Sequence, residues 1–283
     1  MRELHASLWY DPHMRDELVE AVLARLAVER PARDLAGLRA VYASWCRSVP
    51  FDNTLKLIHM AEALPGPLPG STADSFFDTW LEHGTGGTCW AGNGALHDFL
   101  AALGFVVERA LATMLPIPDL QGPNHGSVIV TIDGRRYIAD ASILSGEPIR
   151  ILEPGRDDAT ALLPRIAWLD DKPAVMWRML TAPDGFPCRI DRIGARWDEW
   201  DALHQRTSGW SPFNYELNIR LQRGSESIGV AAGQRFVFQE DGSLDASPLE
   251  GAERMRFLIE NIGISESVVR RVPLDRPIPP RPT

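Results

Sequence analysis

The sequence has few cysteines, no excess of positive charge and no long hydrophobic run, and each absence excludes a class of protein. Only three of its 283 residues are cysteine, and none has the spacing of a CxxC or Cys/His metal site. The net charge is −9 and the pI about 5.3, whereas nucleic acids and anionic membranes bind basic surfaces. No apolar run reaches the ~20 residues that span a bilayer. We therefore expect no metal, no nucleic-acid partner and no membrane partner.

The first residues of the chain do not resemble a targeting signal. Residues 1–13 are mixed and polar and lack the hydrophobic region of a secretory signal. With so few cysteines, this composition indicates a cytoplasmic protein whose thiols stay reduced. A length of 283 residues exceeds the ~150 of a typical domain. The chain therefore predicts one large domain or two to three small ones, and we find no internal repeat.

The spacing of apolar residues changes twice along the chain. Apolar residues at helical spacing predict helices over 14–29, 34–48, 74–83 and 93–103. Patterns typical of strands follow over 105–114, 127–132, 136–139, 175–180 and 188–193. The last part mixes a short helix after Asp198, strands over 213–220 and 235–239, a helix over 249–260 and a Pro-rich tail. This order predicts an α+β fold with parts at 1–104, 105–196 and 197–283.

Cys89 is the most informative residue because of its surroundings. It follows a glycine-rich turn, 84–88 (GTGGT), and stands at the start of the predicted helix over 93–103. A thiol in that position faces the unpaired N–H groups and the positive end of the helix dipole, which favour the nucleophilic thiolate. Cys89 is therefore a candidate nucleophile.

His125 and Asp140 are the candidate base and orienting carboxylate. They flank a predicted hairpin whose turn is Asp133-Gly134, a strong signal for a two-residue turn. His125 lies eight residues before Asp133, and Asp140 lies six residues after Gly134. Antiparallel pairing brings such positions close together across the ladder. The chain therefore predicts a Cys89-His125-Asp140 triad, provided that the helix of Cys89 packs against the open end of this hairpin.

The other candidates are weaker. His97 lies eight residues beyond Cys89, a rise of ~12 Å in one helix, which is too far for a hydrogen bond. His83 is better explained as the end of a helix, and Cys46 and Cys188 as buried structural thiols. The glycine-rich turn lacks the Gly-Lys-Ser/Thr of a phosphate-binding loop.

Several separate segments resemble the arylamine N-acetyltransferase family. Residues 50–53 (PFDN) resemble its Pro-Phe-Glu-Asn segment, and 86–93 (GGTCWAGN) its Arg-Gly-Gly-x-Cys-x-Glu-x-Asn block. His125 followed by an apolar strand and 137–140 (YIAD) resembles its His and Val-Asp pair at the same spacing. Residues 211–213 (SPF) and 257–264 (FLIENIGI) are similar to parts of its third domain. The likeness extends over most of the chain.

The resemblance implies a fold, a site and an activity. The expected fold is an N-terminal helical domain (1–104), a central β-barrel domain (105–196) and a C-terminal α/β lid (197–283), with a papain-like Cys-His-Asp core at their junction. The implied reaction is ping-pong transfer of an acyl group from a thioester, usually of coenzyme A, to an amine, with no bound cofactor. We expect turn or oxyanion support from Gly86, Gly87 and Asn93, and substrate contacts from Phe51, Trp90, Gly126 and Phe213.

Three departures from the family pattern lie around Cys89. The family arginine before Gly-Gly is Thr85, the family glutamate of Pro-Phe-Glu-Asn is Asp52, and the long polar residue two positions after the cysteine is Ala91. A charge pair between positions 52 and 85 cannot form. We expect the smaller side chains at positions 85 and 91 to leave space for a bulkier acyl group or amine, and the donor to be an acyl-coenzyme A or an acyl carrier protein thioester.

Two other readings of the same residues stay open at this point. The same three residues would also serve a thiol hydrolase, such as a thioesterase or amidase, with water as the acceptor. A relative that binds a ligand without catalysis is the second alternative, although the intact set of three residues argues against it.

Overall fold

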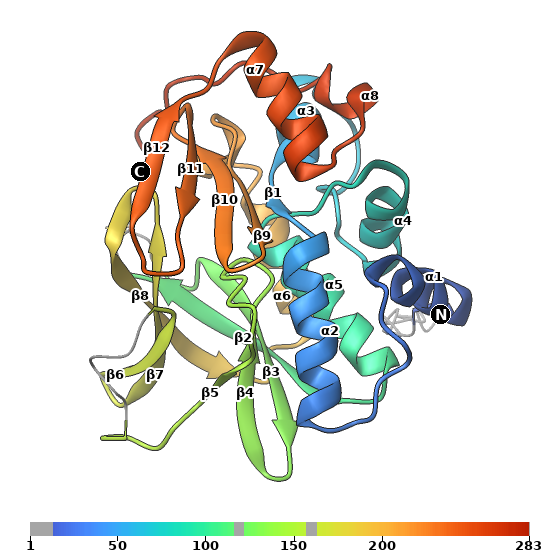
Figure 1. Cartoon of the computed structure of the whole chain (residues 1–283), viewed down its shortest axis with the longest axis vertical. Coiled ribbons are helices and arrows are strands. Elements are labelled where there is room, and N and C mark those ends of the chain that lie inside the picture. Colours follow the sequence, from blue (N-terminus) through green and yellow to red (C-terminus); the bar gives the residue numbers. More distant parts are fainter. Residues whose placement is uncertain (1–13, 116–121, 157–162, 283) are drawn as a thin grey trace, which may run out of the picture.

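A helical layer, a nearly closed β-sheet and a second sheet with its own short helices make up the protein (Figure 1). The computed structural model describes residues 14–115, 122–156 and 163–282. The predicted α+β class is confirmed, and its three parts follow one another along the chain in the expected order. None of the helices in these described residues is long and apolar enough to cross a membrane.

The first part is helical, as predicted. Its helices are α1 (Asp16–Leu26), α2 (Leu35–Ser48), α3 (Thr54–Ala61), α4 (Ala73–His83) and α5 (Cys89–Ala102). Two of them begin at side-chain caps that satisfy free N–H groups, Asp34 for α2 and Thr72 for α4. The sequence pattern did not indicate α3, and α5 begins four residues before its predicted start.

The central part is an antiparallel sheet of seven strands in the order β5-β4-β3-β2-β8-β7-β6. The strands are β2 (Val106–Met114), β3 (His125–Ile132), β4 (Arg135–Ala139), β5 (Ile149–Arg150), β6 (Arg165–Leu169), β7 (Lys172–Met179) and β8 (Ala182–Ile193). The edge strands β5 and β6 approach each other, so the sheet nearly closes into a barrel. The hairpin of β3 and β4 turns at Asp133-Gly134, as predicted, with positive φ at both residues.

The third part begins with α6 (Trp197–Arg206) and contains a second antiparallel sheet. Its elements are a 3₁₀ turn (Pro212–Asn214), β9 (Ile219–Arg223), β10 (Glu226–Ala231), β11 (Gln234–Phe238), β12 (Leu244–Pro248), α7 (Gly251–Arg256), a π-helical segment (Phe257–Ile262) and α8 (Glu266–Val269). The predicted strand over 213–220 is wrong for its first six residues, because Ser211 caps the 3₁₀ turn and Pro212 begins it.

Residues of the first part are built into the third. Strand β1 (Phe51–Asp52) pairs with β9 at the edge of the second sheet. From the following helix, Leu57 and Ile58 are buried in one apolar cluster with side chains of the C-terminal elements. Phe51 also forms a bridge to Gly87 in the turn before Cys89. The turn before the candidate nucleophile is therefore connected to the second sheet. The division of the chain into domains at residues 104 and 196 stays a prediction.

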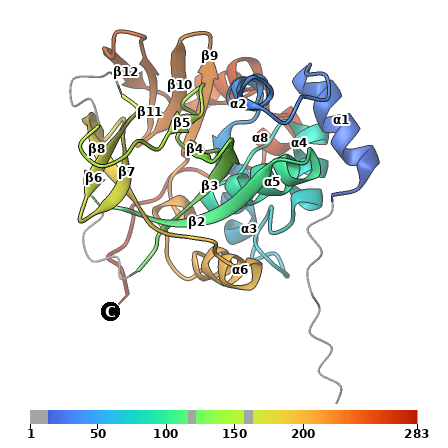
Figure 2. The same ribbon diagram turned by 90° about the horizontal axis from the view of Figure 1, so that it is seen from below.

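Helix α5 lies at the centre of the molecule, between the barrel sheet and the other helices (Figures 1 and 2). It contacts α4, α6, β2 and β3, and all but three of its fourteen residues are buried. A helix that is buried on every side needs no polar face. The residue at its first position therefore sits where the three parts of the chain meet.

The position of α3 yields a stability prediction. We expect Leu57→Ala to lower the free energy of unfolding by about 2–5 kcal/mol, because it removes a buried side chain from the C-terminal cluster. Leu274→Ala is the matched control, since Leu274 is 79% exposed and should change stability by less than about 0.5 kcal/mol. Urea unfolding followed by tryptophan fluorescence measures both. Equal effects of the two substitutions would contradict this placement of α3.

Candidate active site

The turn before Cys89 is held by the main chain and by one buried carboxylate. The N–H of Gly86 donates a hydrogen bond to Asp52, and the N–H of Asp52 donates to the carbonyl of Gly87 at 3.2 Å. A Cβ at Gly86 would lie 1.7 Å from the carbonyl oxygen of Pro50, so only glycine fits there. The turn delivers Cys89 to the first position of α5, where no side chain caps the helix.

Asp52 occupies the position of the family glutamate and has taken a different role. Its second carboxylate oxygen accepts from the N–H and the hydroxyl of Thr54, at 2.8 and 2.7 Å. Burial raises the pKa of the Asp52 carboxyl, and these donors oppose the rise. Thr85, at the arginine position, is fully buried, and its hydroxyl has no hydrogen-bond partner among the described residues. Asp52 therefore holds the turn by hydrogen bonds, where the family pattern would lead us to expect a charge pair between positions 52 and 85.

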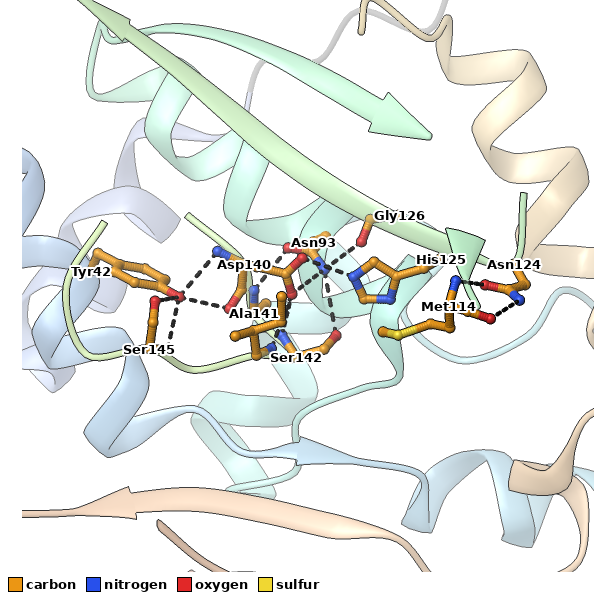
Figure 3. Close-up of polar contacts among 11 residues, drawn as sticks. Tyr42, Asn93, Met114, Asn124, His125, Gly126, Asp140, Ala141, Ser142 and Ser145 are labelled. Carbon is orange, nitrogen blue, oxygen red and sulfur yellow. Dashed lines mark hydrogen bonds and ion pairs between the residues drawn. The ribbon is translucent and has the colours of Figure 1, made fainter. Parts of the chain in front are cut away.

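His125 and Asp140 form a buried pair (Figure 3). Nε2 of His125 lies 2.8 Å from Oδ2 of Asp140, and each side chain is 1% exposed. Burial lowers the pKa of His125, but the charge of Asp140, its hydrogen bond and the contributions of Cys188 and Cys89 together outweigh burial and raise that pKa well above its ordinary value. Burial likewise opposes ionisation of Asp140, yet its pKa is lowered to about 2 by His125 and by hydrogen bonds. The pair therefore favours an imidazolium next to a carboxylate.

The second oxygen of Asp140 has three donors of its own. Oδ1 accepts from the N–H groups of Ser142 and Ile143 at 2.8 and 3.1 Å, and from Nδ2 of Asn93 at 3.2 Å. The Tyr42 hydroxyl donates to the Asp140 carbonyl at 2.8 Å and accepts from its N–H at 3.1 Å. The carboxylate is thus held by the start of β3, by the segment after β4 and by α5, while α2 holds the main chain of Asp140.

Asn93 joins the helix of Cys89 to the hairpin of His125. Its Nδ2 also donates to the carbonyl of Gly126 at 2.7 Å, and its Oδ1 accepts from the N–H of Ala141 at 2.8 Å (Figure 3). These bonds use both ends of the amide. The side chain therefore sets the position of α5 against the hairpin and is not free to bind an oxyanion.

Cys89 completes the group from the other side of the imidazole. Because Nε2 of His125 faces Asp140, Nδ1 is the ring nitrogen left for the thiol. The thiol lies near enough to His125 to contribute to its raised pKa. Cys89 is 6% exposed. The structure therefore brings together the three residues that the sequence singled out.

The predicted substrate contacts lie in two aromatic pairs. Phe51 and Phe213 meet edge to face, with ring centroids 5.4 Å apart. Trp90 meets Trp200 of α6 in the same way at 5.0 Å, and the Trp200 indole donates to the Trp90 carbonyl. Gly126 lies under Trp200, and a Cβ there would be 2.3 Å from its ring. Trp90 and Gly126 are next in the chain to Cys89 and His125, and contact of the four predicted residues with substrate stays a prediction.

The small residues at positions 85 and 91 are both buried. Thr85 is fully buried. The Cβ of Ala91 packs against the main chain of two glycines, because a Cβ on Gly70 or Gly87 would lie 2.8 Å from it. The segments that contain Gly70 and Gly87 therefore occupy the space that a longer side chain at position 91 would need.

The weaker candidates Cys46, Cys188, His97 and His83 have structural surroundings. Burial raises the pKa of Cys46 and of Cys188 to about 12, so both stay thiols at neutral pH. Nδ1 of His97 lies 2.7 Å from Asp98. His83 contacts the hydroxyl of Ser265. Among the described residues, no group of three or more His, Cys, Asp or Glu is placed to hold a metal ion.

Four residues near the site were not singled out from the sequence. Tyr42 lies within the helix predicted over 34–48, and Trp200 has no distinguishing neighbour in the sequence. Lys56 and His204 line a pocket beside the turn that precedes Cys89. Only the packing of α2, α3 and α6 shows these positions.

Comparison with known proteins agrees with this geometry. The N-acetyltransferase family model matches residues 34–161. An arylamine N-acetyltransferase of Mycolicibacterium smegmatis is 30% identical over 229 residues, which are 76% of this chain and 72% of that protein. The chain belongs to the arylamine N-acetyltransferase family. The resemblance inferred from its segments is confirmed, and the protein is an acyltransferase by family.

Solved members of the family share the fold. The structure of the Mycobacterium marinum arylamine N-acetyltransferase aligns with a TM-score of 0.74 at 20% identity, over 90% of this chain and 98% of that one. The same enzyme in complex with CoA aligns with a TM-score of 0.73 at 20% identity, over 90% and 98% of the two chains. The enzyme of Salmonella typhimurium gives 0.72 at 16% identity, over 92% and 98%.

The environments of the three cysteines predict selective alkylation. We expect iodoacetamide at pH 7 to modify Cys89 at least tenfold faster than Cys46 or Cys188, because the latter two are fully buried thiols. Peptide mass spectrometry over a time course measures the three rates in one sample. Modification of all three cysteines at similar rates in the folded protein would contradict the assignment of Cys89 as the reactive thiol.

Proposed function

We propose that this protein transfers an acyl group from a coenzyme A thioester to an amine through an acyl-cysteine on Cys89. The observation that carries the proposal is the buried His125–Asp140 pair, 2.8 Å apart, beside a thiol at the start of a helix. Family membership supports N-acetyltransferase activity, and a relative from M. marinum binds CoA in a solved complex.

The first half-reaction forms the acyl-enzyme. His125 holds the proton of Cys89 as an imidazolium, and Asp140 stabilises that cation and fixes the ring. The thiolate attacks the thioester carbonyl, the bond to the coenzyme A sulfur breaks, and His125 returns the proton to the departing thiolate. Main-chain N–H groups at the start of α5, among them that of Cys89, stabilise the oxyanion, with one more from a neighbouring loop.

The second half-reaction transfers the acyl group to nitrogen. The amine attacks the acyl-cysteine carbonyl while His125, now neutral, accepts its proton. The carbon–sulfur bond breaks and the thiolate of Cys89 is restored beside the imidazolium. No observation favours a carrier-protein arm over coenzyme A as the donor. A preference for acyl groups or amines larger than acetyl and aniline stays part of the proposal, although Ala91 is closely packed.

Intact-mass spectrometry after mixing with a panel of acyl-coenzyme A thioesters tests the proposal. We expect a stoichiometric mass increase equal to the acyl group, which amine discharges faster than water does. Cys89→Ala removes the nucleophile, so it should form no adduct and lose at least ~10³-fold in rate. Cys46→Ala is the matched control and should acylate normally, since Cys46 lies on α2 and not on the turn that carries Cys89.

Two outcomes would overturn the proposal. Turnover by Cys89→Ala at a rate close to that of the unaltered protein would remove Cys89 from the chemistry. Loss of the acyl group to water at the same rate with and without amine would instead indicate a thiol hydrolase. The donor that acylates fastest identifies the acyl group.

A further inference from the structure

Lys56 is a buried cation without a counter-ion. The sequence has only two lysines, Lys56 and Lys172. Lys56 lies on α3 and is 5% exposed. Its ammonium group donates to the hydroxyl and the carbonyl of Thr207, at 2.8 and 3.3 Å, and no carboxylate of the described residues lies within ion-pair distance of it. A buried charge with only neutral partners is costly, and such groups are concentrated at functional sites.

The Lys56 side chain lines a pocket next to the nucleophile. The pocket is small, with about 10 Å³ of accessible space, and it is partly open to solvent. Its wall includes Lys56 of α3, His204 of α6 and residues 86–88, which immediately precede Cys89. The pocket therefore lies beside the turn that carries the nucleophile.

His204 supplies a second unused polar group in the same wall. It is 3% exposed, and its ring makes no hydrogen bond to any residue that the structure describes. Burial, with the nearby charge of Lys56, lowers the pKa of His204 to about 3. The ring is therefore neutral at physiological pH and can donate one N–H to a ligand in the pocket.

The charges around the pocket favour a small anion. Burial lowers the pKa of Lys56 to about 8, and Cys89 opposes the fall, so the amine is mostly protonated at pH 7. Asp52 also lines the pocket and would repel an anion, but its oxygens already accept from Gly86 and Thr54. One ammonium and one N–H donor facing the same space match a carboxylate.

We propose that Lys56 and His204 form a subsite for a carboxylate carried by one of the two substrates. This inference rests on the proposed function, since it assigns a substrate class to that site. The carboxylate belongs either to an aromatic amine acceptor or to a dicarboxylic acyl group on the donor. Seated in the pocket, it gives the ammonium group of Lys56 its missing counter-ion and places the rest of the substrate beside Cys89.

Matched substrates separate the two sources. The acceptor arm compares 4-aminobenzoate with 4-aminobenzamide, and the donor arm compares malonyl-coenzyme A with isovaleryl-coenzyme A, which has the same shape without the charge. We expect kcat/KM to favour the anionic member at least tenfold in one arm. Lys56→Met should reduce that ratio at least tenfold. Lys172→Met, which alters a half-exposed side chain on β7, should leave the ratio as it is.

A binding measurement on the unaltered protein keeps the inference testable if Lys56→Met does not fold. Benzoate should slow the reductive methylation of Lys56 more than that of Lys172, and benzamide should not, as read by peptide mass spectrometry. Two results would overturn the subsite. One is an equal ratio of kcat/KM values for Lys56→Met and the unaltered protein in both arms. The other is that neither benzoate nor malonyl-coenzyme A protects Lys56 from methylation. If no donor acylates Cys89, the proposed function fails, while protection of Lys56 still decides the subsite.

Discussion

The buried carboxylate of Asp140 is the constraint on which the rest of the site depends. A charge this deep is costly unless it is paired and fully hydrogen-bonded. Here Oδ2 faces His125 and Oδ1 accepts three hydrogen bonds. One of those donors is Asn93, which belongs to the helix of Cys89, so the bonds that satisfy the carboxylate also fix α5 against the hairpin. The energetic requirement of one buried charge thus sets the relative positions of nucleophile, base and orienting residue, and these positions carry the proposed chemistry.

The same dependence extends to the second sheet. Asp52 is the last residue of β1, which pairs with β9, and its side chain holds the N–H of Gly86. Asn53, the next residue, donates to the carbonyls of Phe213 and Glu216 at 2.9 and 2.8 Å. The C-terminal part of the chain is therefore connected through one short segment to the turn that presents Cys89. A substitution in this segment should therefore alter the position of Cys89 without contacting it directly.

Much of this arrangement could be predicted from local sequence signals. The hairpin of His125 and Asp140 was predicted from Asp133-Gly134, because a tight two-residue turn requires positive φ at both residues and this pair tolerates it. The position of Cys89 followed from the glycines before it. The helix α3 and the residues Lys56, His204 and Trp200 could not be predicted, because their roles arise only when α3 and α6 pack against the turn. The strand expected over 213–220 was misplaced because Ser211 and Pro212 start a 3₁₀ turn there.

The central claim is that Asp140 holds His125 as a cation beside Cys89. Nuclear magnetic resonance of ¹⁵N-labelled imidazole, assigned with His125→Gln, measures this directly in Cys89→Ala, where the thiol no longer titrates. We expect the His125 ring to stay protonated above its ordinary pKa of 6.5, since the charge and the hydrogen bond of Asp140 oppose burial. In the double variant with Asp140→Asn, burial is the largest remaining effect, and the pKa should fall below 6.5. Titration of His125 near 6.5 in both proteins would contradict the account.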